Sequence, residues 1–129
     1  MGGQDEGSLF TRLVPILHVG DLTAERRFYE ALGMRVTYEG PEYPDFIAIG
    51  AGALEFGLEL RDDFDAEAAA KALVWQIGVS DIDEAEGLCT RAGLQFERRT
   101  HEPAEGWRYH TLELVSPNGY RVVLEGPSE

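Results

Sequence analysis

The stretch LHVGDL, residues 17–22, and the stretch LGMRV, residues 32–36, both have counterparts 60 residues further along the chain: IGVSDI at residues 77–82 and AGLQF at residues 92–96. In each copy the aspartate and the glycine stand twelve positions apart. One such match could arise by chance, but a strand, an aspartate, a helix and a glycine that recur in order indicate an internal duplication. The sequence therefore predicts two copies of one structural unit.

Each copy is predicted to begin with a strand and a helix. Residues 13–19 are apolar and partly β-branched, which is typical of a strand. Asp21 precedes an apolar stripe with helical spacing, so its carboxylate can cap the helix by accepting backbone N–H bonds of the first turn. Gly33 stands where the end of that helix favours a left-handed backbone. Asp81 and Gly93 frame the second helix in the same way.

Three short strands are expected after each helix. In the first copy they cover residues 34–39, 45–50 and 53–60, and in the second copy residues 94–99, 108–115 and 120–125. The segment Ser116-Pro117-Asn118-Gly119 is typical of a tight turn between the last two strands. Each copy is therefore a βαβββ module.

The expected architecture is an α+β fold of two tandem βαβββ modules, residues 11–60 and 74–127, within one structural domain. Neither module could bury its sheet face alone, so the two must pack together. Residues 61–73 are acidic and then alanine-rich, and are expected to form the linker and to include one helical turn. Residues 1–10 are expected to be a flexible tail, because the segment up to Ser8 is glycine-rich and acidic and does not resemble a signal peptide.

Composition narrows the classes of function. The 129 residues include 11 Lys and Arg against 24 Asp and Glu, a net charge of −13. A nucleic-acid partner or an anionic membrane surface is disfavoured, whereas a cationic ligand would be attracted. No apolar run approaches the roughly 18 residues that a membrane span needs. The single cysteine, Cys89, allows no intrachain disulfide, is expected to be buried in a helix, and fits the reducing cytoplasm.

The doubled module resembles the vicinal oxygen chelate superfamily, which includes glyoxalase I, extradiol dioxygenases and bleomycin-resistance proteins. The matching pieces are Val19-x-Asp21-Leu22, Phe28-Tyr29-x-x-Leu32-Gly33 and Ser116-Pro117-Asn118-Gly119-Tyr120-Arg121-Val122. The resemblance extends over residues 12–126. It implies a mixed sheet that curls around a cavity, and a homodimer with two clefts at the module interface. These motifs specify a fold more strongly than a function.

Metal-dependent members of this superfamily place four ligands, usually His and Glu, on the first and last strands of the two modules. The resemblance puts those positions at Val14, Glu55, Val74 and Val123. Sliding the alignment by one residue offers Pro15 and Trp75, which are no better as ligands, and Trp75 has the parity of the interior. One carboxylate would hold a divalent ion weakly. We therefore expect no metal and no cofactor, and a metal-dependent glyoxalase or dioxygenase is the less favoured alternative.

His18 shares strand parity with Val14 and is expected to face the cavity. It could be a hydrogen-bonded histidine in the wall of the fold, a contact to an organic ligand, or half of an improvised metal site with Glu55. His18 and Glu55 are also the candidate acid–base groups of a metal-independent lyase, isomerase or cyclase, which is the alternative to a binding function.

The pattern is closest to the antibiotic-binding branch of the superfamily. The segment Pro15-Ile16-Leu17-His18-Val19-Gly20-Asp21 and the tryptophan-bearing loop at residues 103–109 carry this likeness. The expected function is metal-independent binding and sequestration of a small hydrophobic or aromatic molecule, with or without a cationic group, as in drug resistance. Stacking on aromatic rings would hold such a ligand. The expected ligand-binding residues are Val14, His18, Tyr43, Phe46, Glu55, Val74, Gln76, Trp107, Tyr109 and Val123.

Overall fold

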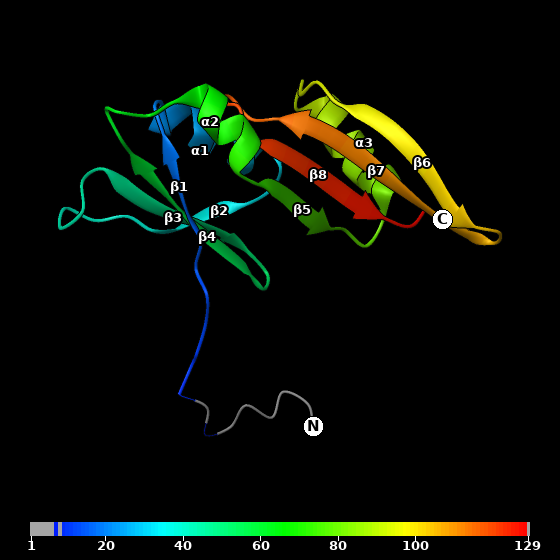
Figure 1. Ribbon diagram of the computed structural model, residues 1–129, viewed down its shortest axis with the longest axis horizontal. Helices are drawn as coiled ribbons and strands as arrows, with labels where there is room; N and C mark the ends of the chain where they lie inside the picture. Colours follow the sequence, from blue (N-terminus) through cyan, green and yellow to red (C-terminus); the bar gives the residue numbers. More distant parts are fainter. Residues whose placement is uncertain (1–6, 8, 129) are drawn as a thin grey trace.

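The computed structural model describes residue 7 and residues 9–128, and they form two βαβββ modules that lie side by side (Figure 1). The first module contains β1 (Ile16–Val19), α1 (Leu22–Ala31), β2 (Arg35–Tyr38), β3 (Phe46–Ala51) and β4 (Leu54–Leu60). The second contains β5 (Val74–Gly78), α3 (Ile82–Arg91), β6 (Glu97–Ala104), β7 (Trp107–Val115) and β8 (Arg121–Gly126), and α2 (Ala66–Ala72) connects the two. The predicted α+β fold of two tandem modules is confirmed.

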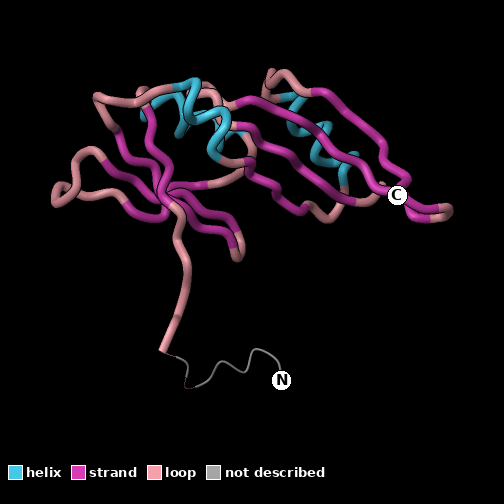
Figure 2. Tube along the Cα trace, viewed as in Figure 1, coloured by secondary structure: helices cyan, strands magenta, loops and turns pink. Residues whose placement is uncertain are grey.

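Each module forms its own four-stranded mixed sheet. The strand order is β1-β4-β3-β2 in the first sheet, here called sheet A, and β5-β8-β7-β6 in the second, sheet B. In each sheet the first strand runs parallel to the last, and the remaining neighbours are antiparallel. Figure 2 shows the two sheets as separate groups of strands. The identical strand order is what a duplicated module predicts.

The helix ends follow the sequence signals. Asp21 and Asp81 are N-caps whose carboxylates accept backbone N–H bonds from the first turns of α1 and α3. Gly33 and Gly93 have positive φ angles of 94° and 73° just beyond the helices. None of the helices in residues 9–128 has the length and apolar character to cross a membrane.

Two expectations about element boundaries were wrong. The linker contains a two-turn helix, α2, because Asp65 caps an alanine-rich segment with high helix propensity. The strand expected at residues 94–99 is β6, which begins at Glu97 and extends to Ala104. The tryptophan-bearing segment is therefore the end of a hairpin, with Ala104 opposite Trp107 and Gly106 at a φ angle of 82°. Pro103 is tolerated there because β6 is an edge strand.

A single hydrophobic core runs through both modules. Alternate strand residues such as Leu17 and Leu124 point toward the helices and are buried, together with Cys89, as predicted for the cysteine. The rings of Phe56 on β4 and Trp75 on β5 have centroids 5.2 Å apart, so the two cores meet. Trp75 points toward the interior, as its parity predicts, but its side chain is only half-buried.

A buried carboxylate ties the second module to the first. Glu25 on α1 is fully buried, and its Oε1 accepts hydrogen bonds from the backbone N and the Nδ2 of Asn118, at 3.1 and 2.8 Å. The Tyr29 hydroxyl donates to the other oxygen at 3.0 Å. Asn118 lies in the turn between β7 and β8, and its Oδ1 accepts from the backbone N of Gly20 and Asp21. These bonds hold the two sheets in one relative orientation.

The N-terminal segment leaves the body of the molecule. Most of the tail expected at residues 1–10 lies outside the described residues. Residues 9–15 precede β1 without belonging to a helix or strand, and Figure 1 shows this segment running away from sheet A. Leu9 and Leu13 are 86% and 87% exposed.

Candidate functional site

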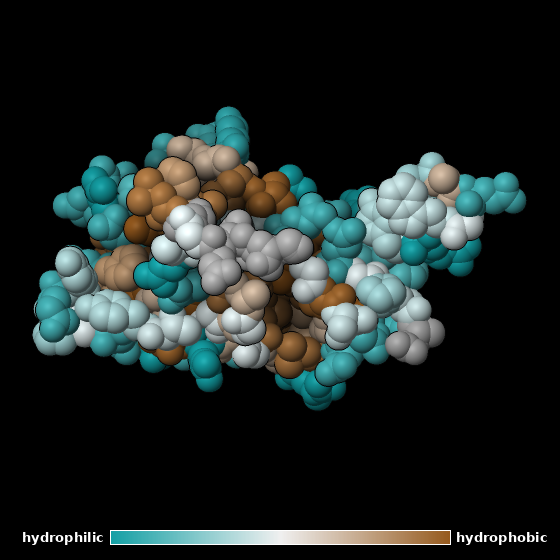
Figure 3. Space-filling view, turned by 90° about the horizontal axis from the view of Figure 1, so that it is seen from below, coloured by the Kyte–Doolittle hydropathy of each residue, from teal (hydrophilic) through white to brown (hydrophobic). Residues whose placement is uncertain are grey.

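Each sheet has one face packed against the core and one face that no helix covers. The second face is called the open face here. On sheet A the open face carries His18, Phe46, Glu55, Gly57 and Glu59, which alternate with buried core residues. On sheet B it carries Val74, Gln76, Tyr109, Thr111, Val123 and Glu125. Seen from below, apolar surface gathers over the left half and the centre of the molecule, whereas the projecting end at the right is mostly hydrophilic (Figure 3).

The polar side chains on the open face of sheet A form two separate groups, one around Glu59 and one around Glu55. His18 Nε2 lies 3.2 Å from Glu59 Oε1, and both side chains are about half exposed. Glu55 accepts a bond from Arg12 Nη1 at 3.1 Å and from the Thr37 hydroxyl at 3.0 Å. The hypothesis that Glu55 assists His18 was wrong. His18 stands opposite Glu59 in the strand register, and Glu55 lies four residues further along β4, roughly 13 Å away.

The aromatic residues of sheet A cluster at its outer end. The Phe46 ring lies across Gly57, where a Cβ atom added to the glycine would stand 2.5 Å from the ring. Tyr38 is 6.2 Å from Phe46 and 6.5 Å from Tyr43, between ring centroids. The Tyr38 hydroxyl donates to Glu42, and desolvation together with this bond raises the pKa of Tyr38. Tyr43 is 64% exposed in the loop before β3.

Sheet B carries a row of rings on its open face. Trp107 and Tyr109 have ring centroids 6.1 Å apart, and Tyr109 stacks on His101 at 4.8 Å with an interplanar angle of 18°. His101 Nε2 and the Thr111 hydroxyl are hydrogen-bonded at 3.0 Å, which fixes the imidazole. The row brings together two of the expected ligand residues. Sequence reasoning missed His101. The signal was the alternation of strand residues across the hairpin, which puts His101 opposite Tyr109 and on the same face.

Three more expected residues, Val74, Gln76 and Val123, lie together on β5 and β8. The Gln76 side-chain amide donates to the Glu125 carboxylate. Among the described residues, no lysine or arginine forms an ion pair with Glu125. Sequence reasoning missed Glu125 and Glu59, which occupy equivalent positions on the last strands of the two sheets.

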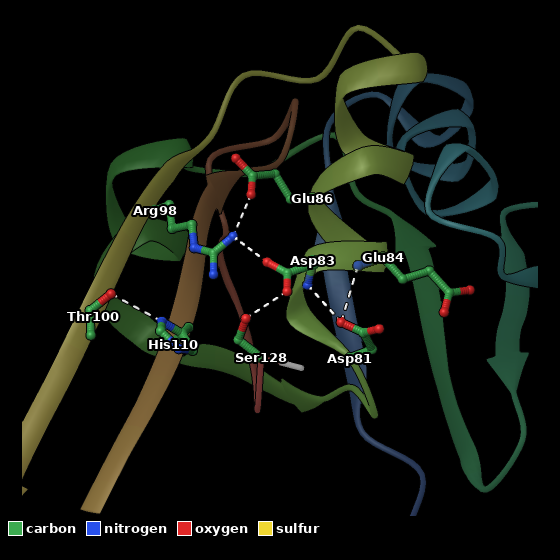
Figure 4. Close-up of polar contacts among 8 residues, drawn as sticks. All are labelled: Asp81, Asp83, Glu84, Glu86, Arg98, Thr100, His110 and Ser128. Carbon is green, nitrogen blue, oxygen red and sulfur yellow. Dashed lines mark hydrogen bonds and ion pairs between the residues drawn. The ribbon is translucent and has the colours of Figure 1, made fainter.

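The third histidine belongs to the opposite face of sheet B. His110 is hydrogen-bonded to the Thr100 hydroxyl on the side of the sheet that faces α3 (Figure 4). On the same side, Arg98 points from β6 toward α3 and binds Asp83 and Glu86, and the bonds to these carboxylates raise the pKa of Arg98. This polar layer fastens α3 to sheet B and is separate from the open face.

Comparison with known proteins gives matches in structure only. No protein-family model and no curated protein match the sequence. A bleomycin-binding protein complexed with bleomycin aligns with a TM-score of 0.66 and 21% identity, over 92% of this chain and all of the other. A glyoxalase/bleomycin resistance protein/dioxygenase from Alicyclobacillus acidocaldarius aligns with a TM-score of 0.70 and 20% identity, over 92% of each chain. The chain therefore shares the fold of these proteins, in agreement with the resemblance to the vicinal oxygen chelate superfamily. Lactoylglutathione lyase from Agrobacterium tumefaciens is also similar, with a TM-score of 0.62, 16% identity, and 92% of this chain and 95% of the other covered.

The strand register corrects one of the positions that the vicinal oxygen chelate resemblance assigns to metal ligands. Ile16 pairs with Gly57 and Gln76 pairs with Val123. Ile16 and Gln76 are equivalent in the 60-residue repeat, so the counterpart of Val123 in the first module is Gly57, and Glu55 corresponds instead to Arg121. The four positions therefore hold Val14, Gly57, Val74 and Val123. Within residue 7 and residues 9–128, no group of three His, Cys, Asp or Glu side chains could hold a metal ion.

The expected ligand residues fall into two groups, one on each sheet of the vicinal oxygen chelate fold. One hollow, of about 510 Å³, lies at the module junction and is lined mainly by apolar residues such as Phe28, Leu94 and Val115. A smaller one of about 260 Å³ includes His18 beside α2. Five hollows in the described part of the chain were compared, and none of these five is lined by expected residues from both sheets.

Proposed function

We propose that this protein binds and sequesters a small hydrophobic or aromatic molecule, such as an antibiotic or another natural product, without a metal ion. The observation that carries the proposal is the row formed by Trp107, Tyr109 and His101 on the open face of sheet B, with ring centroids 6.1 and 4.8 Å apart. A flat ring can stack on such a row, because offset-stacked and edge-to-face aromatic contacts are favourable at these separations. The likeness in fold to a protein named as bleomycin-binding agrees with this proposal.

The charge of the chain favours ligands that carry a cationic group. Glu125 lies on the same open face as the aromatic row, and its bonded partner is the neutral amide of Gln76. The net charge of −13 adds a long-range attraction for cations. A ligand with a flat aromatic part and a cationic part would thus find both of its partners on sheet B.

The proposed assembly is a homodimer with two clefts. The two groups of expected ligand residues lie on different sheets, and in a dimer each cleft would combine sheet A of one copy with sheet B of the other. Cys89, the single cysteine, is compatible with a reducing compartment, and the proposal places the protein in the cytoplasm.

Native mass spectrometry with a panel of aromatic and cationic natural products, including a bleomycin-type glycopeptide, tests the binding function. We expect one panel member per subunit, retained at its original mass. Replacing Trp107 or Tyr109 with alanine should weaken its affinity by about tenfold, the equivalent of one stacking contact. Thr90→Ala, on the exposed end of α3, is the matched control and should bind like the wild type. If the Trp107→Ala and Tyr109→Ala variants bound the panel member as tightly as the wild type, this would contradict a site on the aromatic row.

A second candidate is a metal-independent lyase, isomerase or cyclase. It rests on the contact between His18 and Glu59, because a carboxylate 3.2 Å from an imidazole can stabilise the protonated ring during proton transfer. A lyase would release products of changed mass, whereas an isomerase or a cyclase that only rearranges bonds would release a product of unchanged mass, which chromatography separates from the panel member. His18→Ala should then abolish the product while leaving affinity largely intact, whereas in a pure binding protein no product forms in any variant.

A further inference from the structure

The strand register of sheet B puts one carboxylate next to the aromatic row. Thr111 on β7 pairs with Glu125 on β8, and Tyr109 stands two residues before Thr111 on the same open face. Glu125 is therefore the diagonal neighbour of Tyr109. Diagonal neighbours of an antiparallel pair are about 7–8 Å apart, a distance that aromatic and long side chains bridge. One small molecule can thus contact the Tyr109 ring and the Glu125 carboxylate together.

The Tyr109 ring presents one of its faces toward the strand that carries Glu125. His101 on β6 stacks on the ring, with centroids 4.8 Å apart and an interplanar angle of 18°. Because β7 lies between β6 and β8, this stack covers the face of the ring that looks toward β6. The opposite face looks toward β8. Trp107 stands beside the ring, two residues away on β7, and is tilted by 39° to it. A flat ligand ring can stack on the β8 side of Tyr109.

The charge of Glu125 is available to a ligand. Its Oε1 accepts a hydrogen bond from the side-chain amide of Gln76, which is neutral. Among the described residues, no lysine or arginine forms an ion pair with Glu125, and Arg99 on the same face is bound to Glu97 and Glu113 instead. The amide orients the carboxylate without neutralising it. Its other oxygen can accept a charge-assisted hydrogen bond from a cationic donor.

The spacing of these two contacts specifies the length of the ligand. A ring stacked on the β8 side of Tyr109 lies over β8, two residues from Glu125, which is about 7 Å along the strand. A hydrogen bond of about 2.8 Å to the carboxylate takes up part of this distance and leaves roughly 4–6 Å between the ring centre and the cation. Single bonds of about 1.5 Å put the nitrogen of a two-carbon chain about 5 Å from the ring centre. A two-carbon linker therefore fits.

We propose that the open face of sheet B binds an arylalkylamine, a flat ring that carries a primary ammonium group two carbons away. The ring stacks on the β8 side of Tyr109 and lies beside Trp107, and the ammonium group donates to Glu125. Gln76 is a positioning residue that holds the carboxylate. The inference rests on the aromatic row of the proposed function, and it adds the chemical class of the ligand and the residue that selects it.

A series of amines with different linkers tests the spacing. NMR titration gives the dissociation constants of benzylamine, phenethylamine and 4-phenylbutylamine, and of the neutral alcohol with the same chain as each amine. Dividing the affinity of each amine by that of its alcohol cancels the apolar contribution of the linker. We expect this ratio to be at least about tenfold for phenethylamine, and at least about threefold smaller for the other two amines. Equal ratios for the three chain lengths would overturn the spacing, and a ratio of one for phenethylamine would overturn the ionic contact.

Variants of Glu125 test which carboxylate selects the amine. Glu125→Asp withdraws the carboxylate by one carbon, about 1.5 Å, so the largest ratio should move from phenethylamine to 3-phenylpropylamine. Glu125→Gln should reduce every ratio to near one while the affinity for 2-phenylethanol stays unchanged. Glu67→Gln removes the same charge from exposed α2 and should keep the ratios of the wild type. Circular dichroism verifies that each variant is folded. An optimum that stays with phenethylamine in Glu125→Asp, or an equal loss in Glu67→Gln, would overturn the role of Glu125.

The outcomes separate the ligand class from the proposed function. If a panel member binds and loses affinity in Trp107→Ala and Tyr109→Ala, but the amines show no preference for a linker, the arylalkylamine is overturned and the aromatic row stands. If Tyr109→Ala binds phenethylamine as tightly as the wild type, the stacking contact of the proposal is overturned. If the wild type binds neither a panel member nor any of the amines, the proposed function fails together with the inference.

Discussion

At the scale of single residues, the contact between the two modules depends on one buried carboxylate, that of Glu25. Glu25 has three neutral hydrogen-bond donors, the two nitrogens of Asn118 and the Tyr29 hydroxyl. The residue equivalent to Glu25 in the second module is Ala85, so the contact occurs once and breaks the symmetry of the repeat. A buried charge that loses its donors is costly, and this junction is therefore more sensitive to substitution than the exposed ion pairs.

Tyr29 makes this junction sensitive to alkaline pH. Burial, and then the negative charge of Glu25, raise the pKa of Tyr29 far above its ordinary value. In the unfolded chain this hydroxyl ionises near about pH 10. Its stabilising contribution is therefore complete below about pH 10 and decreases as the pH rises further, because only the unfolded chain releases the proton. The free energy of unfolding should fall by about 1.4 kcal/mol per pH unit for this tyrosine.

Urea unfolding at pH values on both sides of 10, about 9 and about 11, measures the effect. Burial also raises the pKa of Tyr120, which should contribute in the same direction. Tyr29→Phe is expected to be less stable than the wild type at about pH 9 but to lose less stability between the two pH values. An unchanged loss in Tyr29→Phe would show that another group is responsible.

At the scale of the elements, packing between β3 and β4 shapes the open face of sheet A. Gly57 on β4 leaves room for the Phe46 ring of β3, and Ala48 is its register partner. Small residues there allow the ring to lie flat across the sheet. On sheet B the positions equivalent to Gly57 and Phe46 hold Val123 and Thr111, so the two open faces differ in chemistry although the strand order is identical.

Gly57→Ala should destabilise the protein by about 1–3 kcal/mol, because the new Cβ atom would stand 2.5 Å from the Phe46 ring and force it to move. In a Phe46→Ala background the same substitution should cost almost nothing. Chemical denaturation of the four proteins of this cycle gives the coupling free energy. Gly78→Ala, where no atom lies within 4 Å of the added carbon, is the matched control. Additive effects of Gly57→Ala and Phe46→Ala would disprove the steric contact.

At the scale of the whole molecule, unbalanced negative charge opposes folding. The net charge is −13, and most of the ion pairs, such as Arg26 with Glu39, are well exposed and contribute little. Self-repulsion among carboxylates should therefore dominate the electrostatics of the folded state.

Adding sodium chloride should raise the midpoint of urea unfolding, because salt shortens the range of repulsion to about 8 Å at physiological ionic strength and less above it. The measurement is a series of unfolding curves from low salt to about 0.5 M at one protein concentration. The slope of each curve should stay constant, which would show that the surface exposed on unfolding is unchanged. A midpoint that falls with salt would mean that attractive pairs, such as those of Arg98, outweigh the repulsion.

Much of this fold could be predicted from the sequence. The capping residues Asp21 and Asp81, the glycines after the helices and the alternation of apolar residues are local signals, and they act within a few residues of where they stand. Those signals determined the two modules, their strands and the faces on which the expected ligand residues lie. Parity alone was sufficient to put His18 on the open face.

The tertiary structure decided which side chains meet. Only the register between β1 and β4 joined His18 to Glu59 rather than Glu55, and matched Gly57 with Val123. Only packing between the modules brought Asn118 to Glu25, across 93 positions of the chain. The physical reason is that a shift of register by two residues preserves every local preference and the apolar pattern while changing every partner across the strands. Such partners are selected by the summed contacts of distant segments, which no local stretch of this sequence contains.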